Sequence, residues 1–175
     1  LAQSLSSAGR AEEANAAVKS WLSEHPETVG PRMLLAQLAL EQDRPALAVD
    51  EYRRVLELRP DTAVALNNLA MLLAEDEPKE ALELAERGLA QRPEDPAFMD
   101  TLGLVLLNLD EPERAREILA KAHAATPDPS IAFRYARALA ATGAPDQARR
   151  VLLQNAAANY PEKAAAEALL QELDQ

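Results

Sequence analysis

Apolar residues recur along the chain with the period of a helix. Leu66, Leu69, Ala70 and Leu73 are spaced by three, one and three residues, which places them on one face of a helix. Near the C-terminus, apolar residues at 165, 166, 169, 170 and 173 follow the same rule. The pattern therefore predicts a protein built from amphipathic helices.

The limits of the predicted helices follow from proline and capping residues. Pro45, Pro78, Pro112 and Pro145 fit the first turn of a helix, where a missing N–H is harmless, and Asp95 and Asp128 fit caps or first-turn carboxylates. We predict helices at residues 10–24, 30–43, 45–58, 62–75, 78–91, 96–109, 112–125, 129–142, 145–159 and 162–173.

A second set of prolines divides the chain into units of nearly equal length. Pro26, Pro60, Pro93, Pro127 and Pro161 lie 34, 33, 34 and 34 residues apart, and each is expected to end a helix. Each unit also holds two small residues about twelve positions apart, which would let two helices approach closely. These pairs are Ala36 and Ala48, Ala70 and Ala81, Gly103 and Ala115, and Ala136 and Ala148. The unit is predicted to be an antiparallel helix pair.

This period and these paired small residues resemble the tetratricopeptide repeat. The resemblance is strongest in AVALNNLAMLLAEDEPKEALELAERGLAQRPED and in PAFMDTLGLVLLNLDEPERAREILAKAHAATPD, and it covers essentially the whole chain. It implies an all-α fold, a right-handed α-solenoid of antiparallel helix pairs. The implied units are residues 1–28 (a partial repeat), 29–60, 61–93, 94–127 and 128–160, with a capping helix at 161–175.

The first residues look like the middle of a unit. Ala2 and Ala14 form another small pair, and Gly9 lies at the expected turn, so LAQSLSSAG resembles the tail of a first helix. We therefore expect a fragment of a longer protein, with any signal peptide, lipid anchor or earlier repeats upstream.

Composition limits the classes of partner. Hydrophobic residues make up 48% of the chain but aromatic residues only 3%, so alanine and leucine supply the core. The net charge of −11 opposes binding to nucleic acid or anionic lipid. The longest apolar runs, such as residues 104–107, are far shorter than the roughly 20 residues of a membrane helix. We expect a protein or peptide partner, no nucleic acid and no membrane insertion.

The residues that could carry chemistry do not form a recognisable site. The chain has no cysteine, and His25 and His123 fall in different units. The glycines form no phosphate-binding loop, and Trp21 is predicted to pack in the core. We therefore expect no enzymatic activity, no metal and no cofactor.

The resemblance implies a binding surface, because the first helices of tetratricopeptide units line the concave face of the superhelix. We predict that Asn67 and Asn68 face this groove, where an amide could pair with a peptide main chain. Replacing both by alanine should then leave folding nearly unchanged, and local capping or solvent exposure is the alternative role. The predicted groove residues are Met33, Gln37, Asn67, Asn68, Met71, Asp100, Thr101, Leu104, Asn108, Arg134 and Arg137.

The same comparison argues against one known binding mode of the family. Members that grip a terminal carboxylate use an asparagine at the position matched by Asn68 together with lysines and an arginine on neighbouring first helices. Here the neighbouring positions hold residues without positive charge, namely Met33, Gln37, Asp100 and Leu104. Arg134 and Arg137 alone could supply charge, or they are ordinary surface residues.

The segment ALNNLAMLLAE, followed by DTLG one repeat later, is similar to the C-terminal repeats of bacterial tetratricopeptide lipoproteins associated with PEP-CTERM and exopolysaccharide gene clusters. This similarity implies a lipid-anchored protein on the periplasmic side of the envelope, with a role in polysaccharide or protein export. A cytoplasmic location stays open. The alternative function is a regulatory or targeting module of a larger enzyme.

Overall fold

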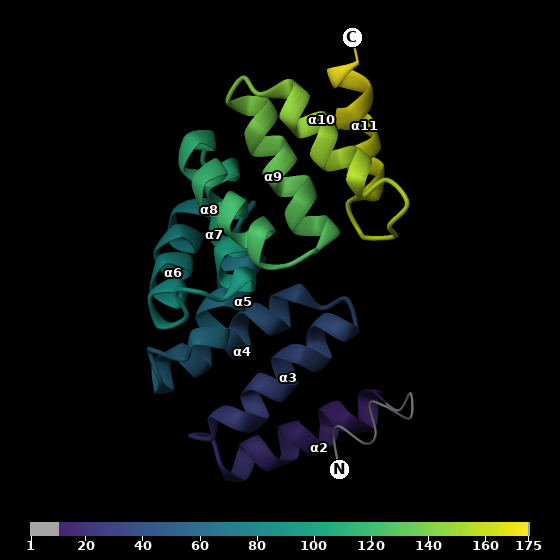
Figure 1. Ribbon diagram of the computed structural model, residues 1–175. Coiled ribbons are helices and arrows are strands. Elements are labelled where there is room, and N and C mark those ends of the chain that lie inside the picture. The colour runs from purple at the N-terminus through teal and green to yellow at the C-terminus, as the bar shows by residue number, and fades with distance from the viewer. Residues whose placement is uncertain (1–10, 175) are drawn as a thin grey trace.

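The protein is described by a computed structural model in which residues 11–174 are placed, and within these residues all regular elements are α-helices (Figure 1). The prediction of an all-α solenoid is confirmed. The helices are α2 (Ala11–Glu24), α3 (Val29–Glu41), α4 (Pro45–Leu58), α5 (Ala63–Leu73), α6 (Pro78–Gln91), α7 (Pro96–Asn108), α8 (Pro112–Ala125), α9 (Pro129–Ala141), α10 (Pro145–Gln154) and α11 (Lys163–Leu173).

Proline and aspartate fix many of the helix starts, as predicted. Helices α4, α6, α7, α8, α9 and α10 all begin with proline, whose missing N–H would have had no partner inside the helix. Asp95 caps α7 by accepting from the N–H of Ala97 at 3.1 Å. Asp128 caps α9 by accepting from the N–H groups of Ser130 and Ile131. The carboxylates thus satisfy otherwise unpaired backbone donors.

The helices form antiparallel pairs that stack along the chain. The pairs are α3 with α4, α5 with α6, α7 with α8, and α9 with α10, and each helix also packs on the next one in sequence. First helices of neighbouring pairs touch as well, α5 with α7 and α7 with α9. Figure 1 shows the resulting stack, with α2 at the N-terminal end and α11 at the C-terminal end. Contacts between near neighbours are typical of repeat proteins.

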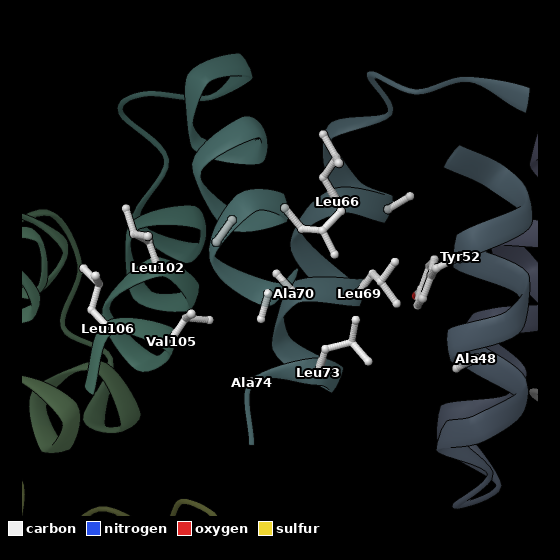
Figure 2. Close-up of a cluster of buried hydrophobic side chains, with 14 of the residues drawn as sticks. Ala48, Tyr52, Leu66, Leu69, Ala70, Leu73, Ala74, Leu102, Val105 and Leu106 are labelled. Carbon is white, nitrogen blue, oxygen red and sulfur yellow. The ribbon is translucent and has the colours of Figure 1, made fainter. Parts of the chain in front are cut away.

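The core runs between the pairs and consists mainly of leucine, valine and alanine. The predicted stripe of α5, which is Leu66, Leu69, Ala70 and Leu73, is buried. Figure 2 shows α5 between α4, which contributes Ala48 and Tyr52, and α7, which contributes Leu102, Val105 and Leu106. The small residues Ala36, Ala48, Ala81, Ala115, Ala136 and Ala148 have no exposed surface, which agrees with close helix approach.

The predicted helix at 145–159 is too long. Helix α10 ends at Gln154, and Asn155 donates from Nδ2 to the carbonyl of Val151 at 3.0 Å. This bond satisfies a carbonyl of the last turn, and residues 155–157 continue as a turn.

The prediction that Trp21 packs in the core is also wrong. Its side chain is 51% exposed and stacks on His25, with the ring centroids 4.2 Å apart. Ala14, Val18 and Leu22 form the buried stripe of α2, and residue 21 lies about 100° away from residue 22 around the helix. The segment LAQSLSSAG lies outside the described residues.

Candidate functional site: the surface of the first helices

The predicted groove residues come from the first helices of four successive pairs, α3, α5, α7 and α9, which we call the first-helix surface. The structure separates them by burial. Gln37 and Met71 are exposed, while Asn67, Asp100 and Thr101 are buried. The partly buried ones are Met33, Asn68, Leu104, Asn108, Arg134 and Arg137.

A hollow of about 310 Å³ lies between α3 and α5, and we call it the α3/α5 hollow. Its lining residues are Gly30, Met33, Leu34, Gln37, Leu40, Tyr52, Val64 and Asn68. Leu40 and Val64 are 39% and 42% exposed, so both offer apolar surface to the hollow. Neither residue is among the predicted groove residues, although each stands on a predicted first helix outside its buried stripe.

Asn68 lines this hollow and is held by the second helix of the preceding pair. Its Nδ2 atom donates to the hydroxyl of Tyr52 at 2.9 Å, and Tyr52 is only 2% exposed. Within residues 11–174 the Oδ1 atom of Asn68 makes no hydrogen bond. The amide is therefore fixed in orientation and still has an acceptor to offer.

Asn67 does not have the predicted outward position. It is 7% exposed, and its Oδ1 atom is buried without a hydrogen-bond partner. The expectation that both amides point away from the packed helices is wrong for Asn67, and the effect of their loss on folding stays a prediction. The pattern of α5 did not reveal this because Asn67 follows Leu66 at the border of the buried stripe.

A second hollow, of about 330 Å³, lies farther along the same surface, and we call it the α7/α9 hollow. It is lined by Met71 from α5, by the starts of α7 and α9, and by the residues that precede them. Its carboxylates are Asp95, Asp100 and Asp128, and no lysine or arginine is among the described residues that line it.

Asp100 and Arg134 form an ion pair next to this hollow. Arg134 Nη1 lies 2.8 Å from Asp100 Oδ2, and Arg134 Nη2 lies 2.6 Å from Glu162 Oε1 at the start of α11. The side chains of Asp100 and Arg134 are about nine-tenths buried. Arg134 is therefore already shared between two carboxylates and is not a free cation for a ligand.

The Asp100 carboxylate is poorly compensated despite this ion pair. Its Oδ1 atom is buried and has no hydrogen-bond partner. Burial raises the pKa of Asp100 from 3.8 to about 6, against the opposing effect of Arg134, and the negative charges of Asp128 and Glu162 add to the rise.

Three further groove candidates have contacts within the protein. Asn108 donates to the carbonyl of Ala74 at 2.8 Å and so ties α7 to the end of α5. Thr101 donates to the carbonyl of Ala97 in its own helix. The guanidinium of Arg137 lies 5.9 Å from the centre of the Phe133 ring. Burial lowers the pKa of Arg137, with a smaller contribution from the charge of Arg134.

The described residues provide no other chemical centre. Among residues 11–174, no group of three or more histidines and carboxylates is arranged to hold a metal ion. His25 lies in the turn that follows α2 and stacks on the ring of Trp21. His123 lies in α8 next to the ring of Tyr135. In the same part of the chain, every helix is too short or too polar to span a bilayer.

Relatives and solved structures share the repeat and the fold. The chain is 29% identical over 133 residues, or 75% of its length, to the TPR repeat-containing protein PA4667 of Pseudomonas aeruginosa, and it spans 22% of that protein. It is similar to the structure of PilF from Pseudomonas aeruginosa at 25% identity and a TM-score of 0.79, covering 98% of this chain and 79% of that one.

A further structure is that of YrrB, which is described as a TPR protein with an unusual peptide-binding site. The two structures match over 90% of this chain and 81% of the YrrB chain, with 24% sequence identity and a TM-score of 0.70.

Models of the repeat family match most of the sequence. One described as tetratricopeptide repeat matches residues 1–63 and 33–96, and a second with the same description matches residues 72–132. The matched stretches contain the pairs α3 with α4, α5 with α6, and α7 with α8. They also contain the residues of α5 and α7 that line the two hollows. With this match and the stacked helix pairs described above, the chain belongs to the tetratricopeptide repeat family.

Proposed function

We propose that this chain is a noncatalytic scaffold that binds a peptide segment, or a segment of a partner protein, on its first-helix surface. The observation that carries this proposal is the set of exposed apolar side chains on that surface. Leu40, Val64 and Met71 are each about two-fifths exposed and come from neighbouring first helices. Covering such side chains with an apolar partner would contribute roughly 25 cal/mol per Å² of buried area.

The α3/α5 hollow has the features needed to hold an extended chain. Leu40 and Val64 offer apolar walls for a partner side chain, and the Oδ1 atom of Asn68 offers an acceptor for a main-chain N–H. Because Tyr52 already fixes the Asn68 amide, little side-chain entropy is lost when the partner binds. Peptide binding by YrrB, which shares the fold, supports this class of partner.

The first-helix surface is a poor match for a terminal carboxylate. Arg134 is paired with Asp100 and Glu162, and Arg137 is half-buried over Phe133. A carboxylate brought to this region would also meet three aspartates. The binding mode that we propose therefore relies on apolar contact and main-chain hydrogen bonding.

A pair of matched variants tests the proposal. The double variant Leu40→Glu, Val64→Glu places charge in the α3/α5 hollow, and the control Leu153→Glu places charge on an apolar side chain of α10 that is 53% exposed. Each purified chain is used to capture partners from an extract of the source cells, and the affinity of the captured protein is then measured by calorimetry.

We expect the double variant to bind at least about tenfold more weakly, because interfaces rely on a few buried anchors, while Leu153→Glu binds like the parent chain. Both variants should keep the parent helix content by circular dichroism. Full affinity of the double variant together with a loss in Leu153→Glu would show that another face binds the partner.

We also propose that the complete protein acts on the outer side of the bacterial cytoplasmic membrane, in export or assembly of envelope components. The proposal is supported by the similarity of ALNNLAMLLAE and DTLG to envelope lipoproteins of the same family. A fusion of alkaline phosphatase to the C-terminus of the complete protein tests it, since this reporter folds actively only after export. An inactive fusion in cells that contain the full-length product would contradict an envelope location.

A further inference from the structure

The α7/α9 hollow differs from the α3/α5 hollow in its charge. Asp95, Asp100 and Asp128 line it, and they come from the residue before α7, from α7 itself and from the residue before α9. Two of these carboxylates use one oxygen to cap a helix, Asp95 at Ala97 and Asp128 at Ser130 and Ile131. In both cases the bonds go to Oδ1. Oδ2 of Asp128 takes no part in the cap, and Oδ2 of Asp95 lies 3.9 Å from Nη1 of Arg92.

Positive groups nearby do not neutralise these carboxylates. The N-termini of α7 and α9 together contribute about one positive charge, and Arg134 contributes another. Four carboxylates oppose them, because Glu162 joins the three aspartates through its ion pair with Arg134. Arg92 is the remaining cation near Asp95, and it lies 3.9 Å away on an exposed side chain. With Arg92 counted as well, about one negative charge therefore remains uncompensated around the hollow.

Asp100 is the second observation that points to a ligand. Its side chain is nine-tenths buried, it lines the hollow, and its Oδ1 atom lacks a partner. A buried carboxylate oxygen without a donor is costly, and a cation close to it would reduce that cost. The burial-raised pKa of Asp100 agrees with this view.

The same hollow has an apolar side that suits the stem of a long basic residue. Met71 is 43% exposed at its edge, and Pro96 and Ile131 also line it. Lysine and arginine bury their methylene stems on such surfaces while the charged end reaches polar groups. A metal ion would gain nothing from this apolar side.

We infer that the α7/α9 hollow binds a lysine or arginine side chain of the partner, whose charged end lies between Asp95 and Asp128 beside Asp100. This inference rests on the proposed function, since it assigns one side chain of the segment that the first-helix surface binds. It adds a charge rule for that partner: the segment carries a basic residue beyond the part held in the α3/α5 hollow.

Short peptides of defined charge test this rule on the purified chain. The probes are acetyl-Leu-Ala-Xaa-Ala-Leu-amide with arginine, citrulline or glutamate at Xaa, because citrulline keeps the shape of arginine without its charge. Binding is followed by the shifts of backbone amide signals in nuclear magnetic resonance spectra, together with the carboxyl carbon signal of Asp100.

The protein variants remove charge but keep the caps. Asparagine caps a helix about as well as aspartate, so the double variant Asp95→Asn, Asp128→Asn should fold like the parent chain. The control Asp50→Asn, Glu83→Gln removes the same net charge from exposed positions on α4 and α6.

We expect the arginine peptide to shift amide signals at the starts of α7 and α9 and to bind about tenfold more tightly than the citrulline peptide, as charge-assisted hydrogen bonds do. The glutamate peptide should bind more weakly still. The arginine peptide should also lower the pKa of Asp100 from about 6. In the cap-preserving variant the preference for arginine should vanish, whereas the control variant should retain it.

Equal binding of the arginine and citrulline peptides, or an arginine preference that survives in the cap-preserving variant, would overturn the inference. If the peptides shift signals only around the α3/α5 hollow without regard to charge, the inference fails and the proposed scaffold function stands. If no peptide shifts any signal of the first-helix surface, the basic-residue rule is rejected and the proposed function loses its support as well.

Discussion

Replacing Gly103 by alanine should destabilise the protein, although the same change stabilises most helices. Gly103 lies in the middle of α7, where it faces Leu119 of α8. A Cβ atom built on Gly103 falls 2.5 Å from Leu119 Cδ2 and 2.9 Å from Cδ1, and closer still to Cγ. Leu119 has no exposed surface, so it cannot swing into solvent to make room.

The magnitude follows from two opposing effects. Adding a methyl group to a tightly packed core costs about 1–3 kcal/mol, and the overlap with three carbons of one leucine favours the upper end. Alanine gains about 1 kcal/mol over glycine inside a helix. We therefore expect Gly103→Ala to lower the free energy of unfolding by about 2 kcal/mol. For a chain of this size the melting temperature would fall by about 4–8 °C.

Gly88→Ala is the control, because Gly88 also lies within a helix, in the last turn of α6, but has more room. A Cβ atom there lies 3.3 Å from a carbon of the Phe98 ring and 3.5 Å from Leu66. The helix gain and the small collision should nearly cancel, so we expect a change of less than about 1 kcal/mol.

Urea unfolding followed by circular dichroism at 222 nm measures both variants. A second cycle combines Gly103→Ala with Leu119→Ala, where the new methyl group occupies part of the space left by the leucine. The double variant should be more stable than the sum of the single changes predicts. A Gly103→Ala protein as stable as Gly88→Ala would refute the close approach of α7 and α8.

Two further predictions concern the polar residues of the first-helix surface. Asn68→Ala should destabilise the fold by about 1–3 kcal/mol because the buried hydroxyl of Tyr52 loses its donor. Adding Tyr52→Phe should recover part of this loss of unfolding free energy in urea. No recovery would contradict the role of the hydrogen bond. Asp100 has a folded pKa of about 6 against an unfolded value of 3.8, so its contribution to stability is fully present below about pH 4 and is lost as the pH rises through 6. The unfolding free energy of the parent chain should fall relative to Asp100→Asn by up to about 3 kcal/mol between pH 4 and pH 7, and a constant difference would show that Asp100 is not desolvated.

The helix limits were predictable because local chemistry determines them. Proline cannot donate the backbone hydrogen bond needed inside a helix, and α4, α6, α8 and α10 all begin at the expected prolines. Where such a signal was absent, the prediction failed. Residues 155–160 contain no proline and three alanines, so the sequence favoured a longer helix than α10.

The surface was harder to predict than the fold. The apolar stripe of a helix shows which face is buried, but it does not tell whether a residue at the edge of that face is buried or exposed. For this reason Asn67 was expected to be exposed and Trp21 to be buried. The ion pair of Asp100 with Arg134 joins two different units. Its signal in the sequence was the presence of opposite charges near matching positions of adjacent first helices.

The most direct test of the central proposal is site-specific crosslinking in the source cells. The photoreactive residue benzoylphenylalanine replaces Leu40 or Met71 on the first-helix surface, or the exposed Leu153 of α10 as a control. We predict that illumination links the same partner at Leu40 and at Met71 and does not link it at Leu153. Crosslinking of the partner at Leu153 alone, with none at the two first-helix positions, would contradict the assignment of the binding surface.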